Sequence, residues 1–327
     1  MPRRAFTFLG LVAAFFTASA ADLRVGIIGL DTSHVIAFTK TLNVVTDKDH
    51  VPGAKVVAAF KSFSSDIPSS ADRVESYTKQ IQEQFGVKLV NSVEELCQQV
   101  DVVMLENVDG RPHLELARPV IKAGKRLFID KPVAGSLKDT LEIFRLAKEA
   151  GVPVFTASAY RYYDSMIELK KAPVGDVISA ISYGPAHLEK THPDLYWYGV
   201  HPTEALFTVM GTGCESVTRA ATEENDVVVG LWKGGRVGTL QGLRGKATPH
   251  KVTVFGSKGM AEQKTGSDSY APLLKEVVKF FQTGLSPVAP EETVEMFAFM
   301  EAADESKRQG GKPVKLSDVI EKAKSAK

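Results

Sequence analysis

Three short apolar runs in the first third of the chain constrain the fold more than any other feature. Residues 23–29, 54–60 and 101–106 are dominated by aliphatic side chains and do not alternate regularly with polar positions. Continuous runs of this length suit strands that are covered on both faces. Helical patterns with serine N-caps at Ser92 and Ser136 lie between and after them. This alternation predicts a doubly wound parallel sheet of the α/β class.

The pattern changes after about residue 155. Residues 226–232 and 236–242 flank Lys233-Gly234-Gly235, which is a signal for a tight hairpin. A second pair of apolar runs meets at another glycine-rich turn, and the chain ends in helical patterns. We therefore predict a Rossmann-like dinucleotide-binding domain over residues 21–155. An α+β substrate and oligomerisation domain, with a mainly antiparallel sheet and C-terminal helices, is predicted over 156–327.

The first twenty residues have the pattern of an export signal. Arg3 and Arg4 precede an apolar run over residues 6–16, and Ala18-Ser19-Ala20 supplies a small-residue cleavage site. The run is shorter than the roughly 20 residues that a membrane-spanning helix needs, although an N-terminal anchor is the alternative. We expect a signal peptide over 1–20, of the Sec or the twin-arginine type, and a periplasmic or secreted protein without a membrane segment after cleavage.

Charge and cysteine usage exclude several classes of function. Lysine and arginine number 40 and aspartate and glutamate number 39, so there is no basic surplus for a nucleic-acid backbone. Cys97 and Cys214 are the only cysteines, and they fall in different predicted domains. We expect two separate buried thiols rather than a disulfide.

The turn after the first strand is where a dinucleotide's pyrophosphate would lie, bound by backbone N–H groups at a helix N-terminus. A G-x-G-x-x-G fingerprint would fall on Gly29, Asp31 and His34, so only the first glycine is present. Lys61 follows the second strand, where an acidic residue would bind a ribose hydroxyl, and a lysine suits a 2′-phosphate better. Two interpretations stay open: a dinucleotide site, or an altered turn in which Asp31 and its neighbours only cap the helix. The predicted cofactor-binding residues are Gly29, Leu30, Asp31, Thr32, Ser33, His34, Lys61, Glu106, Asn107, His113 and Lys131.

A second motif follows the strand predicted up to Ile129. Asp130-Lys131-Pro132 resembles the Glu-Lys-Pro motif that the Gfo/Idh/MocA family of sugar and cyclitol oxidoreductases delivers to the nicotinamide, with Asp130 replacing the glutamate. The resemblance implies NAD or NADP as the cofactor, and an exported enzyme would need to hold that cofactor tightly.

The same family carries a histidine within an Asp-x-Gly-x-His-x-x-Asp pattern in its second domain. Here Gly199 and His201 match, Glu204 replaces the last aspartate, and Trp197 replaces the first. The resemblance extends over essentially all of the chain after the predicted signal, but these motifs specify the family better than the reaction.

The chemistry of these residues predicts their roles. A hydride can leave a sugar carbon only if the hydroxyl on that carbon loses its proton, and His201 fits that base. Lys131 would stabilise the developing alkoxide, Asp130 would orient Lys131, and Glu204, three residues after His201, would fix the imidazole tautomer. Without the resemblance, a surface lysine and a core histidine are the simpler interpretation.

Substrate-binding residues are predicted near the end of the strand that precedes residue 158. Arg161, Tyr162 and Tyr198 could bind sugar hydroxyls or a carboxylate, and interdomain packing of the aromatic cluster is the alternative. His187 and His192, with His201 and Glu204, are metal-ligand types, but their spacing lacks a zinc signature. We predict no metal site.

The sequence thus predicts an exported NAD(P)-dependent oxidoreductase acting on a sugar, cyclitol or related polyol. A small-molecule carbohydrate is the expected partner, and a homo-oligomer is the expected assembly. Two other functions remain open. One is a carbohydrate lyase or hydrolase that uses Lys131 and His201 as acid and base, and the other is a non-catalytic carbohydrate-binding protein.

Overall fold

The computed structural model describes residues 21–245, 248–266 and 269–326. The predicted signal peptide over residues 1–20 lies outside the described residues. In the part of the chain that the structure covers, none of the helices combines the length and hydropathy needed to span a bilayer.

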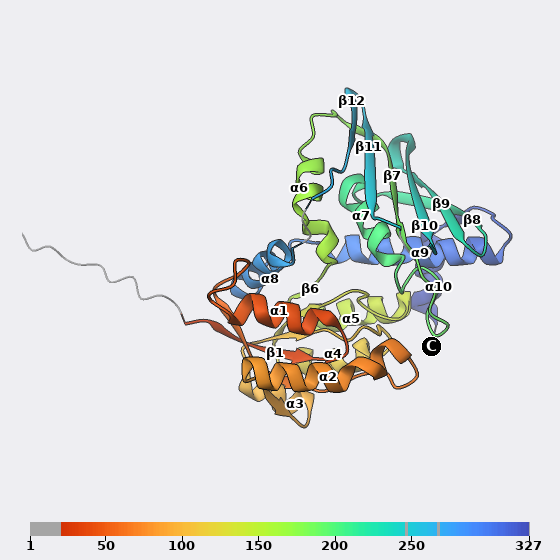
Figure 1. Ribbon diagram of the computed structural model, residues 1–327. Helices are drawn as coiled ribbons and strands as arrows, with labels where there is room; N and C mark the ends of the chain where they lie inside the picture. The colour runs from red at the N-terminus through yellow and green to blue at the C-terminus, as the bar shows by residue number, and fades with distance from the viewer. Residues whose placement is uncertain (1–20, 246–247, 267–268, 327) are drawn as a thin grey trace, which may run out of the picture.

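The first half forms a parallel sheet of six strands in the order β3-β2-β1-β4-β5-β6, which occupies the lower half of Figure 1. The strands are β1 (Leu23–Ile28), β2 (Ala54–Phe60), β3 (Lys88–Val90), β4 (Val102–Leu105), β5 (Arg126–Ile129) and β6 (Val154–Thr156). The helices are α1 (Ser33–Asn43), α2 (Pro68–Phe85), α3 (Val93–Gln99), α4 (His113–Lys122) and α5 (Leu137–Ala150). The doubly wound sheet predicted from the apolar runs is confirmed.

Local signals account for several helix ends in this half. Ser92 and Ser136 each accept a hydrogen bond from a backbone N–H three residues later, as predicted for the N-caps of α3 and α5. Helix α5 ends at Gly151, whose φ of 65° lies in the left-handed region that glycine adopts without strain.

One expectation about this half is wrong. The serine, aspartate and proline content of residues 61–73 predicts a long loop at the carboxyl edge of the second strand. The segment is not a loop throughout, because α2 begins at Pro68 and continues to Phe85. Proline is well placed at the start of a helix, where its fixed φ is suitable and its missing N–H has no intrahelical partner to lose. The prediction failed because serines are common at helix starts as well as in loops, so a segment that is about half helical had the composition of a loop.

The second half is built on a seven-stranded sheet in the order β12-β11-β7-β10-β9-β8-β13, seen in the upper half of Figure 1. Strands β7 and β10 pair in parallel and the other pairs are antiparallel, so the predicted mainly antiparallel sheet and its β9–β10 hairpin are confirmed. The strands are β7 (Val177–Pro185), β8 (Cys214–Ala221), β9 (Asn225–Trp232), β10 (Arg236–Leu243), β11 (Lys251–Gly256), β12 (Gly259–Glu262) and β13 (Val314–Lys315). The helices are η1 (Ala159–Tyr162), α6 (Asp164–Lys170), α7 (Val200–Met210), η2 (Lys233–Gly235), α8 (Ala271–Thr283), α9 (Pro290–Arg308) and α10 (Leu316–Ser325).

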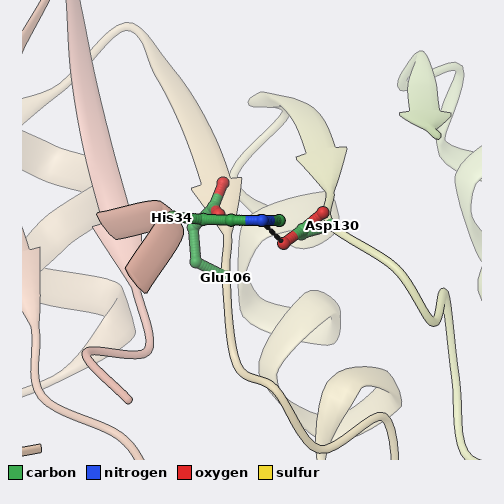
Figure 2. A group of neighbouring side chains, drawn as sticks. All are labelled: His34, Glu106 and Asp130. Atoms are coloured by element: carbon green, nitrogen blue, oxygen red, sulfur yellow. Dashed lines mark hydrogen bonds and ion pairs between the residues drawn. The ribbon is translucent and has the colours of Figure 1, made fainter. Parts of the chain in front are cut away.

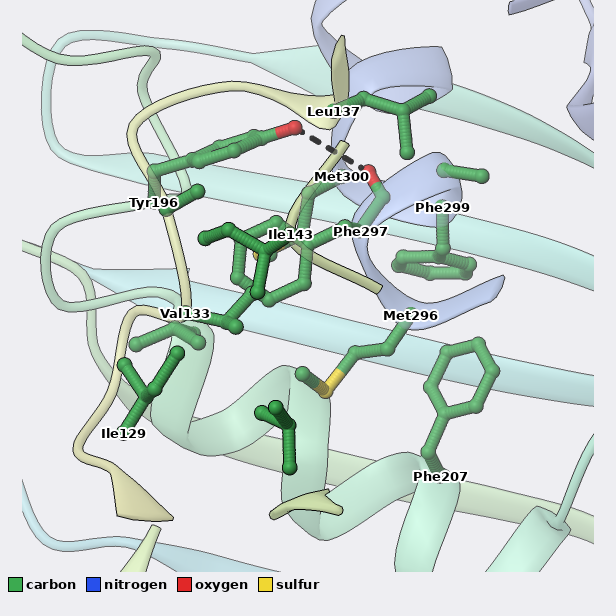
Figure 3. Close-up of a cluster of buried hydrophobic side chains, with 14 of the residues drawn as sticks. Ile129, Val133, Leu137, Ile143, Tyr196, Phe207, Met296, Phe297, Phe299 and Met300 are labelled. Carbon is green, nitrogen blue, oxygen red and sulfur yellow. Dashed lines mark hydrogen bonds between the residues drawn. The ribbon is translucent and has the colours of Figure 1, made fainter. Parts of the chain in front are cut away.

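One apolar core joins the two halves. Figure 3 shows Met296 and Phe297 of α9 in the same cluster as Ile129 of β5, Ile143 of α5 and Phe207 of α7. Each such buried side chain contributes about 1.5–3 kcal/mol, and close packing resists sliding of one half on the other. The end of β5 and the start of α7 are therefore held in a defined relation, which matters for the site below.

The remaining predictions about buried groups agree with the structure. Cys97 and Cys214 are separate, buried and free. Helix α8 returns to the first sheet, where Leu273 and Val277 pack in a cluster with Val25 and Phe38.

Candidate active site

A cavity of about 800 Å³ lies between the carboxyl edge of the first sheet and the second half. Its walls include Ser33 at the start of α1, Lys131 after β5 and His201 in the first turn of α7. The carboxyl edge of a parallel sheet is where ligands bind in folds of this type. The structure therefore brings the two predicted catalytic residues and part of the predicted cofactor turn to one cavity.

The imidazole of His201 is suited to act as a base. Burial, with smaller contributions from the positive charges of Lys131, His250 and His34, lowers the pKa of His201 well below its ordinary value. The neutral ring therefore predominates near pH 7, and a neutral ring can accept a proton.

The partner of His201 is Ser158 and not the predicted Glu204. Ser158 Oγ lies 2.8 Å from His201 Nδ1, whereas the Glu204 carboxylate accepts from the Ser158 N–H at 2.8 Å and from Arg161 Nε at 2.8 Å. A buried carboxylate is stabilised most by a charged donor, so Glu204 turns to Arg161 although it stands near His201 on α7. Sequence reasoning missed Ser158, although it follows the apolar run of β6 at the edge where ligands bind.

The structure places Arg161 and Tyr162, which were predicted to bind substrate, away from the cavity. Arg161 forms ion pairs with Glu204 and, at 2.6 Å, with Glu292 of α9. Neither Arg161 nor Tyr162 is part of the cavity wall in the described chain. Tyr162 packs against the cluster that includes α8, and burial raises the pKa of its hydroxyl. Packing between the halves, the alternative left open above, describes both residues. Tyr198, in contrast, lines the cavity with its ring centroid 6.0 Å from that of His201.

The altered glycine turn keeps its anion-binding end open to the cavity. Thr32 caps α1 by accepting from the His34 N–H, and Thr32 and Ser33 both line the cavity. Asp31 is fully buried, and its carboxylate accepts from Ser70 Oγ at 2.6 Å and from the Val108 N–H at 3.1 Å. Burial raises the pKa of Asp31, and its carboxylate is satisfied away from the helix N-terminus where a phosphate would bind.

The start of the turn is packed tightly. Gly29 has a φ of 91°, and a Cβ built there would lie 2.4 Å from Asn107 Oδ1. Leu30 belongs to the apolar core and not to the cavity. Gly29 thus sets the path of the backbone, and the part of the turn that lines the cavity begins at Thr32.

Other predicted cofactor residues have structural contacts of their own. Lys61 forms an ion pair with Glu75 at 2.5 Å. The Asn107 amide donates to Ser62 Oγ at 3.2 Å, and the buried ring of His113 contacts the carbonyl oxygens of Val133 and Asn107.

Sequence reasoning also missed a cation in the cavity wall. Arg73 of α2 lines the cavity together with Ser69 of the same helix, at a position that sequence reasoning assigned to a loop.

The Asp130 carboxylate bonds a histidine rather than orienting the Lys131 ammonium. His34 Nδ1 lies 2.5 Å from Asp130 Oδ2 (Figure 2). Asp130 Oδ1 accepts from the Lys131 backbone N–H at 2.9 Å. Burial acts to raise the pKa of Asp130, but the charge and hydrogen bond of His34 hold it below its ordinary value. Glu106 completes this group, and burial together with the charge of Asp130 raises the pKa of Glu106 well above its ordinary value.

These residues fit a dinucleotide. The N-terminus of α1, the Thr32 and Ser33 hydroxyls and the Arg73 guanidinium all offer donors to a diphosphate, while Asp31 keeps its charge turned inward. The same cavity continues to Lys131, where the family motif implies a nicotinamide ring.

Comparison with known proteins agrees with this geometry. Residues 23–158 match the model of the Gfo/Idh/MocA oxidoreductase family with an NAD-binding Rossmann fold. Residues 23–158 therefore resemble the NAD-binding part of that family. The predicted resemblance to this family and the predicted class of cofactor are therefore confirmed over residues 23–158.

Curated relatives match over shorter stretches. The chain is 27% identical over 122 residues to the uncharacterized oxidoreductase YhhX of Escherichia coli, covering 34% of this chain and 35% of that protein. It is 25% identical over 171 residues to D-xylose 1-dehydrogenase (NADP(+)) 2 of Haloferax volcanii, covering 50% and 51%. The chain thus spans about a third to a half of the length of these relatives.

Solved structures extend the likeness to both halves. A probable dehydrogenase from Thermotoga maritima superposes with a TM-score of 0.76 at 23% identity, covering 91% of this chain and all of that one. Scyllo-inositol dehydrogenase from Lactobacillus casei, with bound NAD(H) and scyllo-inositol, gives a TM-score of 0.74 at 14% identity, covering 91% and 100%. These likenesses establish that both halves of the chain share the fold of these solved structures.

Proposed function

We propose that this protein is an NAD(P)-dependent oxidoreductase that oxidises a carbinol carbon of a sugar, cyclitol or related polyol, or reduces the corresponding ketone. The observation that carries the proposal is the single cavity that contains the open N-terminus of α1, Lys131 and His201. The relatives named for activity on D-xylose and for binding scyllo-inositol support a polyhydroxylated substrate. Tyr183, Tyr198 and Gln263 add hydroxyl and amide groups to the cavity wall for such a ligand.

Each residue has a distinct part in the proposed reaction. A dinucleotide held by Ser33, Arg73 and the N-terminus of α1 would supply the hydride acceptor. His201 accepts the hydroxyl proton, and Ser158, bonded to Nδ1, leaves Nε2 as the ring nitrogen that takes it. The Lys131 ammonium stabilises the oxygen as negative charge develops.

The proposal is tested by following the absorbance of reduced nicotinamide with NAD⁺ and NADP⁺ against a panel of aldoses and inositols. We expect reduction of at least one of the two dinucleotides. Sugar binding without any redox change or bond cleavage would favour a carbohydrate-binding protein. Cleavage without net reduction would favour a lyase or hydrolase that uses Lys131 and His201.

The pH dependence of the reaction should report the buried state of His201. Because its pKa lies well below the ordinary histidine value, the neutral base is retained as pH falls through 6.5. We expect the acid limb of kcat/KM for oxidation to lie below that pH. The profile of His50→Asn, a histidine in the segment between α1 and β2 that contacts the Thr41 carbonyl, should be unchanged. An acid limb at or above pH 6.5 in the wild type would contradict the role of His201.

Three further expectations are proposals as well. We propose export to the periplasm or beyond, on the basis of the N-terminal charge, apolar run and cleavage site, and N-terminal sequencing of the mature protein tests it. We propose that the boundary between the two domains lies between residues 155 and 156. We also propose a homo-oligomer formed through the open face of the second sheet, where Ile178 and Leu231 are each about half exposed. Sedimentation velocity tests that assembly.

A further inference from the structure

Three side chains meet at the carboxyl edge of the first sheet, beside the cavity. His34 lies in the first turn of α1, Glu106 follows β4, and Asp130 follows β5, and β1, β4 and β5 are neighbours in the sheet (Figure 2). One ring nitrogen of His34 and one oxygen from each carboxylate all lie within 4.8 Å of one another. The three residues are separated by 72 and 24 positions along the chain, so the fold itself brings them together.

The Glu106 carboxylate is the member that the protein leaves without a partner. Its side chain is fully buried, and neither oxygen has a hydrogen-bond partner among the described residues. Asp130 by comparison has two donors, the imidazole of His34 and the Lys131 backbone N–H. Buried polar groups in native proteins are nearly always hydrogen-bonded or bound to an ion, because an unpaired carboxylate loses its hydration without compensation. Glu106 therefore points to a ligand at this place.

We propose that His34, Glu106 and Asp130 bind one divalent first-row transition-metal cation, of the class of Mn²⁺, Fe²⁺ or Zn²⁺. One imidazole nitrogen with two carboxylate oxygens is a mixed N/O donor set, which suits these cations better than the all-oxygen sets that Ca²⁺ and Mg²⁺ take. The charge of two carboxylates also balances that of a dication. The three ligand atoms lie within 4.8 Å of one another. Small side-chain movements would therefore bring each of them to the bond length of about 2.0–2.2 Å that Zn–N and Zn–O bonds have.

The place of the site in the fold gives the cation an open side. His34 and Lys131 line the cavity, whereas Glu106 and Asp130 are buried behind it. Three protein ligands from the buried side leave coordination positions toward the cavity, where an oxygen of water or of a bound ligand could complete the shell. The proposal concerns cation binding alone, so it does not depend on hydride transfer.

Binding is measured on the untagged full-length protein after chelation and removal of the chelator. We expect one Mn²⁺ or Zn²⁺ per chain by calorimetry, and loss of the free Mn²⁺ signal in electron paramagnetic resonance. The variant Glu106→Gln keeps the shape of the side chain and removes its charge. It should weaken binding by about 100-fold or more, since even partners outside the ligand shell are worth 10- to 100-fold. The variant Asp101→Asn, at the residue before β4 that pairs with Arg24, should bind as the wild type does.

Two further readouts keep the result unambiguous. The cation should raise the Tm of the wild type and leave that of Glu106→Gln unchanged, because only a folded site binds it. If Glu106→Gln fails to fold, pulsed electron paramagnetic resonance of Mn²⁺ bound to the wild type should show coupling between the metal and an imidazole nitrogen. No binding at millimolar Mn²⁺ and Zn²⁺, equal binding by a folded Glu106→Gln protein, or bound Mn²⁺ without nitrogen coupling would each overturn the proposal. None of these results bears on whether the protein reduces a dinucleotide.

Discussion

Lys131→Ala and His201→Asn are each expected to lower kcat by about 100- to 10,000-fold while the protein remains folded. The range follows from the usual contribution of a positioned general base and of an electrostatic stabiliser of an oxyanion. Both side chains line one cavity, and His201 keeps a neutral ring there. Steady-state rates of nicotinamide reduction measure the effect, with binding of the dinucleotide measured separately.

The matched control is Lys148→Ala, an exposed lysine in the last turn of α5. It should leave kcat unchanged. If Lys131→Ala retained wild-type kcat with the substrate found in the panel, the assignment of Lys131 to the reaction would be wrong.

Arg219→Met is expected to destabilise the fold by about 3–5 kcal/mol, the cost of removing one partner from a buried ion pair. Arg219 is 1% exposed and donates to Asp226 at 2.7 and 2.9 Å, to Asp194 at 2.8 Å and to Asp304. These bonds join β8 to β9, to α9 and to the segment before α7. Methionine has a similar length but would leave three carboxylates without their shared cation. The midpoint and slope of urea unfolding measure the change.

A surface ion pair supplies the comparison for Arg219. Arg24→Met removes the cation from a pair with Asp101 whose members are both well exposed, and little or no change in stability is expected because water screens such pairs. A loss of stability for Arg219→Met no larger than that for Arg24→Met would show that the buried carboxylates are satisfied in another way.

The sheet of the first half could be predicted from the sequence because its signal is local. Residues 54–60 form β2 as predicted, and the serine caps and terminal glycine of α5 lie within its own segment. The secondary structure of residues 61–73 was harder to predict, because serine and aspartate are common both in loops and at helix starts. Pro68 at the first helical position was the signal that distinguished the two.

The sequence predicted which residues line the cavity better than it predicted which of them contact one another. Lys131, His201 and Tyr198 line the cavity as their motifs indicated. The observed hydrogen bonds join residues that are far apart in the sequence. Ser158 and His201 are 43 positions apart, and His34 and Asp130 are 96 positions apart. Such pairs leave no periodicity in the sequence, so the nearest acidic neighbour on the helix was chosen in place of the serine across the cavity.

The structure also explains how a turn with one glycine can still serve a dinucleotide. Asp31 takes the second glycine position but turns inward to Ser70 and to the Val108 N–H, so its charge does not meet a phosphate. Ser33 and Thr32 stay on the cavity side at the start of α1.

Calorimetric titration of the purified protein with NADH and NADPH, after analysis of any dinucleotide it already carries, tests this central claim most directly. We predict one dinucleotide per chain in the wild type, and at least about 10-fold weaker binding by Ser33→Glu, which places a negative charge at the start of α1. Ser76→Glu, on the exposed side of α2, should bind normally. A wild-type protein that carries no dinucleotide and binds neither NADH nor NADPH would contradict the account.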